Sequence, residues 1–251
     1  MIAGLYTSAN GMVALEEAQA AIANNIANAS TTGFRRHQAV QTGFYQVFSN
    51  VLRRPAAFQF ERAPGGGVKV AETFTDTAPG VLHTTGGPLD LAIEGSGYFV
   101  VETPRGERYT RDGNFMVDVD GDLATAEGYK VLSIDGRSMD VRGGNVVVDA
   151  DGQIAVNGVP AGQVRLVAFE DPQRLRREGE NLFRAPDGVT SVTANGAGTA
   201  VHQGRLESAN VNLPVELTNM LLGLRAYEAN LRAIHAADET VSQLIDRVAM
   251  P

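Results

Sequence analysis

The sequence predicts an α+β protein in which long N- and C-terminal helices pair as a coiled coil on either side of one central, antiparallel, hairpin-rich β-domain. The placement of helix-breaking residues supports this fold class, because residues 1–32 contain no proline and residues 215–250 contain one glycine and no proline. Most glycines and all but two prolines lie between about residues 33 and 204. We therefore expect an N-terminal coiled-coil helix at 1–34, an extended connecting segment at 35–80, the β-domain at 81–205 and a C-terminal coiled-coil helix at 206–251.

The N-terminal segment carries a heptad repeat with two polar interruptions, Ser8 and Gln19. Gly33, which follows two threonines, is suited to a left-handed C-cap at the end of this helix. We expect the helix to pair with the C-terminal helix or with other copies of the chain. Its repeat positions, alternately three and four residues apart, are Leu5, Ser8, Met12, Leu15, Gln19, Ile22, Ile26 and Ala29.

The C-terminal segment carries the same repeat in a more regular form, with Asp238 as its one polar position. Pro214 fits the first turn of a helix, where Asn212 or Leu213 would be the cap. An alternative is two ordinary amphipathic helices beside one domain, but such helices seldom keep a strict heptad period for about four heptads. The repeat positions are Leu217, Met220, Leu224, Tyr227, Leu231, Ile234, Asp238, Val241, Ile245 and Val248.

The middle of the chain has the pattern of successive antiparallel hairpins. Many Asp-Gly and Asn-Gly pairs supply the positive φ that tight hairpins require, and the helical pattern that parallel crossovers would need is missing from this part of the sequence. Gln41–Leu52 is a possible short helix within the connecting segment. The predicted strands are Tyr98–Glu102, Phe115–Val119, Tyr129–Ile134, Val146–Val148 and Val164–Phe169.

Composition excludes several classes of function. The chain has 29 acidic and 21 basic residues and a net charge of −8, which argues against nucleic-acid binding. It contains no cysteine, so thiolate metal sites, disulfides and cysteine nucleophiles are excluded. The sequence has no apolar run long enough for a membrane helix, and its N-terminus lacks the pattern of a cleaved secretory signal.

The motifs that could carry chemistry are incomplete. Asp118–Asp122 resembles the start of a calcium loop, but Leu123 and Tyr129 stand where glycine and glutamate are needed, so a solvated hairpin turn is the better interpretation. The four histidines lie far apart in the sequence. The basic groups Arg35-Arg36, Arg53-Arg54 and Arg174–Arg177 are expected to be solvated or to form salt bridges between subunits. We therefore expect no enzymatic activity, no cofactor, no metal and no small-molecule substrate.

Three stretches, in order along the chain, carry specific motifs. The first is Ala23–Asn28 (Ala-Asn-Asn-Ile-Ala-Asn), followed by a polar run and Gly33-Phe34 with a basic residue after it. The second is Leu89–Val101, which continues through Tyr109–Phe115 and Asp120–Leu123. The third is Leu206–Asn212, followed by Arg225–Asn230 (Arg-Ala-Tyr-Glu-Ala-Asn). Together they resemble the signatures of the bacterial flagellar rod and hook proteins, with two small departures at Ala209 and Leu224.

This resemblance implies a structural subunit of the flagellar basal-body rod, exported through the flagellar type III apparatus without a cleaved signal and polymerising with itself and other axial proteins into a hollow drive shaft across the periplasm. The size fits a mid-sized subunit, either the larger proximal-rod protein, slightly favoured by Phe44–Arg54 and the following Pro55, or the distal-rod protein. An oligomeric β-domain binding or adhesin module is the alternative class. The predicted assembly interface is Asn24, Asn25, Ile26, Asn28, Gly33, Phe34, Leu217, Met220, Leu224, Tyr227, Leu231, Ile234, Val241 and Ile245.

Overall fold

The computed structural model of the chain describes residues 2–42, 69–196 and 198–249. The chain folds as two compact units. The helical unit contains residues 1–27, 37–75 and 212–251, and the β unit contains residues 28–36 and 76–211. Because three segments of one unit alternate with two segments of the other, the chain passes between the units four times. The division of the sequence into four segments stays a prediction.

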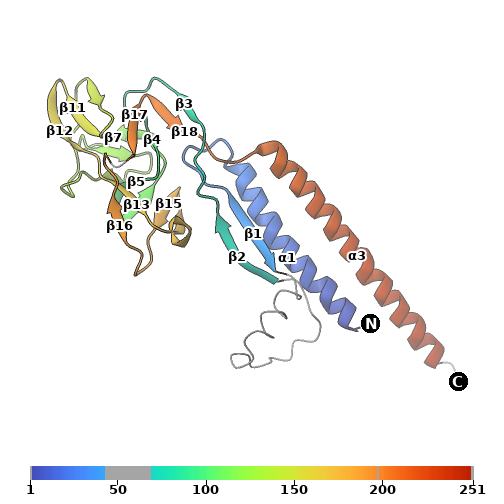
Figure 1. Cartoon of the computed structure of the whole chain (residues 1–251). Helices are drawn as coiled ribbons and strands as arrows, with labels where there is room; N and C mark the ends of the chain where they lie inside the picture. The colour runs from blue at the N-terminus through green and yellow to red at the C-terminus, as the bar shows by residue number, and fades with distance from the viewer. Residues whose placement is uncertain (1, 43–68, 197, 250–251) are drawn as a thin grey trace. The chain divides into compact units, whose positions relative to one another are not determined.

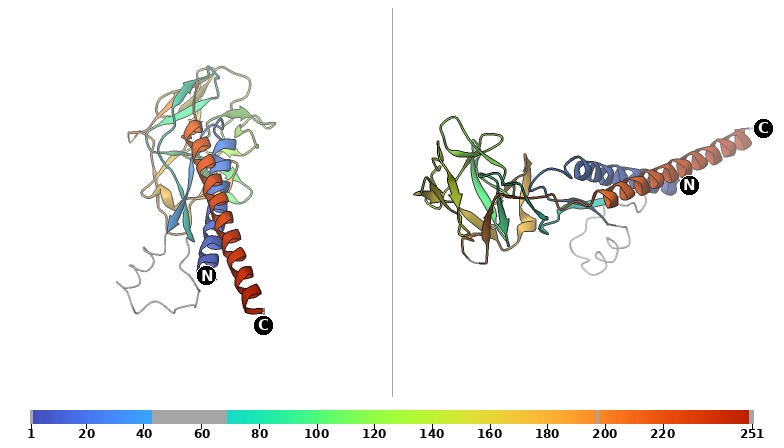
Figure 2. Two further views of the ribbon diagram at one scale, coloured as in Figure 1. Left: turned by 90° about the vertical axis from the view of Figure 1, so that its right-hand side faces the viewer. Right: turned by 90° about the horizontal axis from the view of Figure 1, so that it is seen from above.

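The helical unit contains α1 (Ile2–Ala27), α3 (Leu213–Ala249) and a hairpin of β1 (His37–Thr42) and β2 (Lys69–Thr75). The two helices lie side by side and run antiparallel (Figures 1 and 2). The antiparallel hairpin contacts α1. The predicted helix at Gln41–Leu52 is wrong for its first two residues, which end strand β1, and its remainder lies outside the described residues.

The ends of the helices follow from local sequence. α1 ends at Ala27 and not at Gly33, because Asn28 and the Ser and Thr residues after it form turns, in which short polar side chains compete with the helical backbone. Gly33 does have the expected left-handed backbone, with φ +64°, but within this loop. α3 begins as predicted, with the Asn212 side chain accepting the Val215 N–H at 3.2 Å.

The β unit is antiparallel throughout its described pairings, which confirms the predicted β region. Its largest sheet has the order β14-β15-β6-β5-β9-β8-β7, with β13 paired to β5 and β16. Smaller sheets are β10-β11-β12, β17-β4 and β18-β3. The strands are β3 (Leu82–Thr84), β4 (Leu91–Glu94), β5 (Tyr98–Thr103), β6 (Gly106–Thr110), β7 (Phe115–Val117), β8 (Leu123–Thr125), β9 (Lys130–Val131), β10 (Val146–Val148), β11 (Gln153–Val156), β12 (Val159–Gln163), β13 (Leu166–Phe169), β14 (Arg176–Gly179), β15 (Leu182–Arg184), β16 (Ser191–Thr193), β17 (Ala200–Gln203) and β18 (Arg205–Glu207).

Tight turns form where the dipeptides predict them. Pro104 and Arg105 join β5 to β6, which begins at Gly106, while Asp120-Gly121 lies between β7 and β8 and Asn157-Gly158 joins β11 to β12. Asn157 and Gly158 have φ values of 54° and 81°, as a type I′ turn requires. A short 3₁₀ helix, Pro172–Arg174, follows β13. The sheet order nevertheless departs from a simple succession of hairpins, because β13 and β15 pair with strands distant in sequence.

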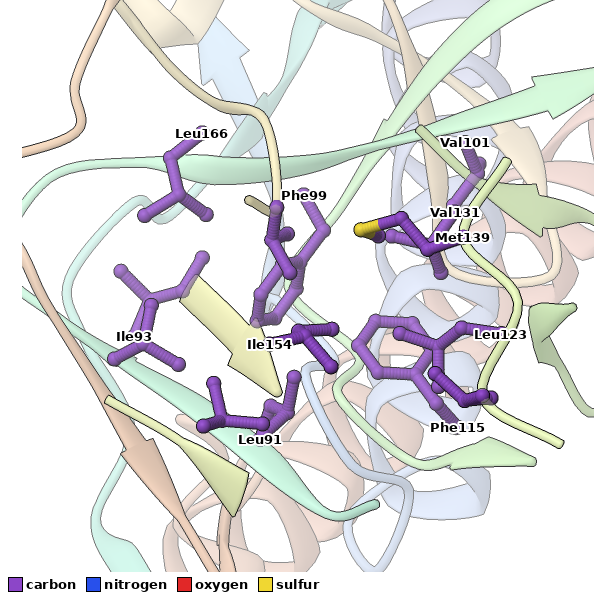
Figure 3. Packing of buried hydrophobic residues seen from close by; sticks show 14 of the residues in the cluster. Leu91, Ile93, Phe99, Val101, Phe115, Leu123, Val131, Met139, Ile154 and Leu166 are labelled. Atoms are coloured by element: carbon purple, nitrogen blue, oxygen red, sulfur yellow. The ribbon is translucent and has the colours of Figure 1, made fainter. Parts of the chain in front are cut away.

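The core of the β unit lies on both faces of β5. Phe99 and Val101 belong to the larger apolar cluster, whereas Tyr98 and Val100 belong to a second cluster on the opposite face. This double burial explains why β5 is a continuous apolar run and not an alternating one. Figure 3 shows the larger cluster, in which the rings of Phe99 and Phe115 meet edge to face with centroids 5.0 Å apart.

Candidate assembly interface

Small and polar residues take part in the contact between α1 and α3. The Gln19 side chain donates a hydrogen bond to the Met220 carbonyl oxygen at 2.9 Å. A Cβ atom at Gly223 would lie 1.9 Å from Gln19 Nε2, so the glycine provides the space that this glutamine occupies. At Gly11, a Cβ atom would lie 3.6 Å from the side-chain nitrogen of Asn230. The absence of a side chain at Gly223 thus makes room for Gln19, whereas Gly11 has space for an ordinary contact with Asn230.

Asn25 joins three elements of the helical unit. Its side chain accepts the His37 N–H at 2.8 Å and donates to the His37 carbonyl oxygen at 2.7 Å, and so pairs with the first residue of β1 as a strand would. The same amide lies 3.4 Å from a carboxylate oxygen of Glu216 in the first turns of α3. Asn25 and Glu216 are fully buried. This predicted interface residue therefore makes contacts within one chain.

The described part of α3 leaves many apolar side chains in solvent. Of the predicted seam, Met220, Tyr227, Leu231 and Ile234 are half-buried, but Leu217 and Leu224 are each 46% exposed. The side chain of Ile245 lies outside the described residues. The residues that α3 turns toward α1 include Glu216, Gly223 and Asn230, about one residue out of register with the heptad repeat. The exposed apolar residues of α3, between 39% and 62% exposed, are Leu213, Val215, Leu217, Leu221, Leu222, Leu224 and Val241.

The loop after α1 is part of the β unit. Gly33 combines a left-handed backbone with close packing, since a Cβ atom there would lie 2.4 Å from the backbone nitrogen of Asp112. Phe34 is buried, with the guanidinium of Arg177 over its ring at 4.4 Å. Thr32 donates to the Asp112 carboxylate at 2.6 Å. Among the other predicted interface residues, Ile26 and Asn28 are half-buried and Asn24 is exposed.

Two arginines and one glutamate form a buried charge network in the β unit. Arg35 and Arg111 each contact a different carboxylate oxygen of Glu207, at 2.7 Å and 3.2 Å. All three side chains are at most 5% exposed. The expectation of a solvated or intersubunit role is therefore wrong for Arg35, because its partner lies within the chain; Arg53-Arg54 lie outside the described residues.

The network holds separate segments of the chain together. Arg35 also donates to the Ala78 carbonyl at 2.8 Å, and the Gly80 N–H donates to Glu207 at 2.7 Å. Asn210 accepts the Arg36 N–H at 2.6 Å and donates to the carbonyl of Ala78 at 2.9 Å. The end of the 28–36 loop, the start of the 76–211 segment and its end are thereby linked side by side.

The charges in this network do not balance. Two guanidinium groups share one carboxylate, and the Nε atoms of both Arg35 and Arg111 are buried without a hydrogen-bond partner. Burial lowers the pKa of Arg111, and the nearby Glu207 carboxylate opposes that shift. The network of Arg35, Arg111 and Glu207 therefore holds two positive charges and one negative charge.

A lysine binds the acidic turn between β7 and β8 and offsets part of its negative charge. The ammonium of Lys130 lies 2.9 Å from Asp120, 2.8 Å from Asp122 and 3.6 Å from Asp118. Its hydrogen bond with Asp122 raises the pKa of Lys130 and lowers the pKa of Asp122. The ammonium group of Lys130 thus lies among the aspartates that resemble the start of a calcium loop.

Across residues 2–42, 69–196 and 198–249 the structure groups no three His, Cys, Asp or Glu side chains in a way that could hold a metal ion. The described helices also include none that is long and apolar enough to span a bilayer. α3 leaves leucines in solvent, and the β unit has a well-packed core of its own. These features are typical of structural proteins that assemble with other chains.

Comparison with known proteins identifies the family. Residues 5–35 match the family described as flagella basal body rod protein, residues 92–157 the flagellar hook protein FlgE/F/G D1 domain, and residues 202–247 the flagellar basal body rod FlgEFG protein C-terminal family. The flagellar basal-body rod protein FlgG of Bacillus subtilis is 31% identical over 98% of this chain and 99% of its own length. The Caulobacter vibrioides rod proteins FlgG and FlgF are 35% and 33% identical, over 94% and 97% of this chain and 95% and 97% of their own lengths.

The chain belongs to the flagellar basal-body rod protein family. It is a structural subunit of the rod and not an enzyme, and its place is the basal body of the bacterial flagellum. The relatives carry both the FlgG and the FlgF name, so the choice between a proximal and a distal rod subunit stays open.

Sequence reasoning missed the residues that make the contacts within the chain. The heptad repeat treats Gln19 as an interruption and assigns Glu216, Gly223 and Asn230 no role in the contact between the helices. One signal was available: Gly223 is the single glycine of residues 215–250, and a lone glycine inside a helix often marks a close approach.

Proposed function

We propose that this subunit polymerises through α1 and α3, pairing as coiled-coil helices with those of neighbouring copies, into the hollow shaft that carries torque from motor to hook. The exposed apolar residues of α3 carry this proposal. Burying a leucine fully is worth about 1.5–3 kcal/mol, so a few such residues per subunit supply enough free energy to drive association. The polar contacts between α1 and α3 leave four leucines of α3 exposed for other chains: Leu217, Leu221, Leu222 and Leu224.

The partners in this proposal are further copies of the chain and other axial proteins of the flagellum, and the route of export is the flagellar type III apparatus without removal of a signal peptide. The rod names of the relatives support the axial partners. The β unit would lie on the outside of the shaft and set its stiffness through lateral contacts between copies.

The decisive experiment replaces Leu224. Since this side chain is 46% exposed, Leu224→Asp should lower the free energy of unfolding of the isolated subunit by about 1 kcal/mol. In the assembled rod the change should remove about 1 kcal/mol more of apolar burial at each contact and add the larger cost of desolvating a carboxylate. We expect the variant to be exported and to fold normally. The rod should stop growing at the position where this subunit would be added, and the cells should not swim.

Two matched variants control this result. Leu224→Ala should be milder, because it leaves a cavity without a charge. Asp238→Asn, at an exposed position of the same heptad series, should leave motility unchanged. Rods of normal length and normal swimming with Leu224→Asp, seen in purified basal bodies and on soft agar, would contradict an assembly role for this face.

Limited proteolysis provides an independent test of the same proposal. In a dilute subunit the apolar surface of α3 has no partner copy to cover it, so we expect the helical unit to be cleaved well before the β unit. Equal resistance of the two units in the monomer would show that the helices need no assembly for their stability.

A further inference from the structure

The β unit contains a cavity beside the buried charge network. Its volume is about 280 Å³, and its walls include Pro79, Tyr98, Arg111, Phe169 and Pro172. These five residues bring two aromatic rings, two proline rings and one guanidinium group to the walls, which also include Thr77, Gly95, Gly97 and Ala168. Ser96, an exposed residue, also lines it and provides access from solvent.

The guanidinium at this cavity lacks a full set of partners. Arg111 is 5% exposed, and its Nη atoms bond to Glu207 and to the carbonyl oxygens of Ile93 and Gly95. Its Nε atom is buried and makes no hydrogen bond. Glu207 is shared with Arg35 and also accepts the Gly80 N–H, so it cannot neutralise both arginines.

The hydroxyl-bearing residues of the wall, Thr77, Ser96 and Tyr98, do not supply the missing negative charge. Burial raises the pKa of the Tyr98 phenol, which therefore stays neutral near pH 7. The guanidinium of Arg111 lies over the Tyr98 ring at 5.3 Å, a favourable contact that leaves the charge in place. The cavity thus combines apolar walls with one excess positive charge.

We propose that this cavity receives an aspartate or glutamate side chain from a neighbouring copy of the chain, so that its carboxylate completes the charge network while its methylene groups contact the rings. This proposal rests on the proposed function, since it names one lateral contact between β units of the rod.

Two observations favour a second copy as the occupant. The chain carries an acidic excess, with a net charge of −8, and exposes acidic residues on its turns, among them Asp135 and Asp187. A small free anion could meet the charge but would leave the apolar walls uncovered. A side chain carried by a turn would cover the apolar wall as well as the charge.

The test supplies the carboxylate from the subunit itself. Ser96→Glu places a carboxylate at the cavity, and Ser96→Gln places a group of equal size without the charge. The Ser96 side chain takes no part in the charge network, whereas substitution of Arg111 would disturb folding. Relative to Ser96→Gln, we expect Ser96→Glu to have a higher Tm and to associate about tenfold or more weakly with wild-type subunits in sedimentation.

The possible outcomes separate this inference from the proposed function. Association of the wild-type chain and of Leu224→Asp is measured in the same sedimentation experiment. Failure of the wild-type chain to associate would contradict the proposed function itself. If the wild-type chain associates and both Ser96 variants behave like it, the cavity is not an interface. If the two variants are equally impaired, the site is steric and the acidic occupant is wrong. Sodium acetate is added to the wild-type chain, with sodium chloride as the control. If acetate raises the Tm of the wild-type chain as much as the Ser96→Glu substitution does, the occupant is a small anion and the proposal is overturned.

Discussion

The two units bury opposite kinds of residues. In the β unit, apolar side chains fill the core, and the charged residues of the family motifs, Arg35, Arg111 and Glu207, are buried with one another. In the helical unit, glycine, glutamine and asparagine take part in the contact between the helices, Met220 and Leu231 are half-buried, and Leu217 and Leu224 lie in solvent. The difference teaches that the β unit closes its apolar core within a single chain, whereas α3 of the helical unit leaves apolar side chains exposed.

The largest expected effect comes from Glu207→Gln. This change keeps the size of the side chain but leaves two buried guanidinium groups without a counter-charge, which should lower the free energy of unfolding of the β unit by about 3–5 kcal/mol. Urea unfolding followed by tyrosine fluorescence measures it. The control is Glu94→Gln, at an exposed carboxylate paired with His202, where the loss should stay below about 1 kcal/mol. Equal losses for the two variants would mean that the network does not stabilise the β unit.

Gly33→Ala should have the next largest effect. Alanine would adopt a left-handed backbone at a cost of about 1–2 kcal/mol and would also press on the backbone of Asp112, adding about 1–3 kcal/mol. Gly136→Ala is the matched control, because Gly136 has φ +73° with no atom within 4 Å of the added Cβ. The difference between the two variants in urea unfolding isolates the packing of the loop on the β unit, and no difference would show that the loop is held loosely.

The smallest expected effect is a change in pH dependence at the acidic turn. The pKa of Asp122 is lowered by Lys130, so this pair stabilises the fold above the ordinary aspartate pKa of about 3.9, and the stabilisation is lost as pH falls through the lower folded value. In Lys130→Met the neighbouring carboxylates repel one another, and protonation should then stabilise the fold. Between pH 5 and pH 3, values chosen around about 3.9, the Tm of the wild-type protein should fall more than that of the variant. Parallel curves would contradict the role of Lys130.

The sequence predicted those features that depend on nearby residues. Glycine after asparagine or aspartate identified the turns, a continuous apolar run identified β5, and Asn212 with Pro214 identified the start of α3. Each of these depends on backbone preference or on contacts between residues close in sequence.

The face of α3 that contacts α1 could not be predicted in the same way. The heptad repeat identifies an apolar stripe, but not whether α1 or another chain covers it, and here α1 lies beside the polar positions next to that stripe. Likewise, nothing local indicates that Arg35 is buried, because its partner Glu207 lies 172 positions later and reaches it only through the folding of the whole β unit.

The repeated passage of the chain between its two units has a mechanical consequence. A force that pulls the units of one subunit apart is borne by four covalent connections in parallel, at residues 27–28, 36–37, 75–76 and 211–212. A single break in the backbone at one of these places leaves three connections intact. A load-bearing shaft built from such subunits would therefore tolerate a cut that would sever two domains joined by a single linker.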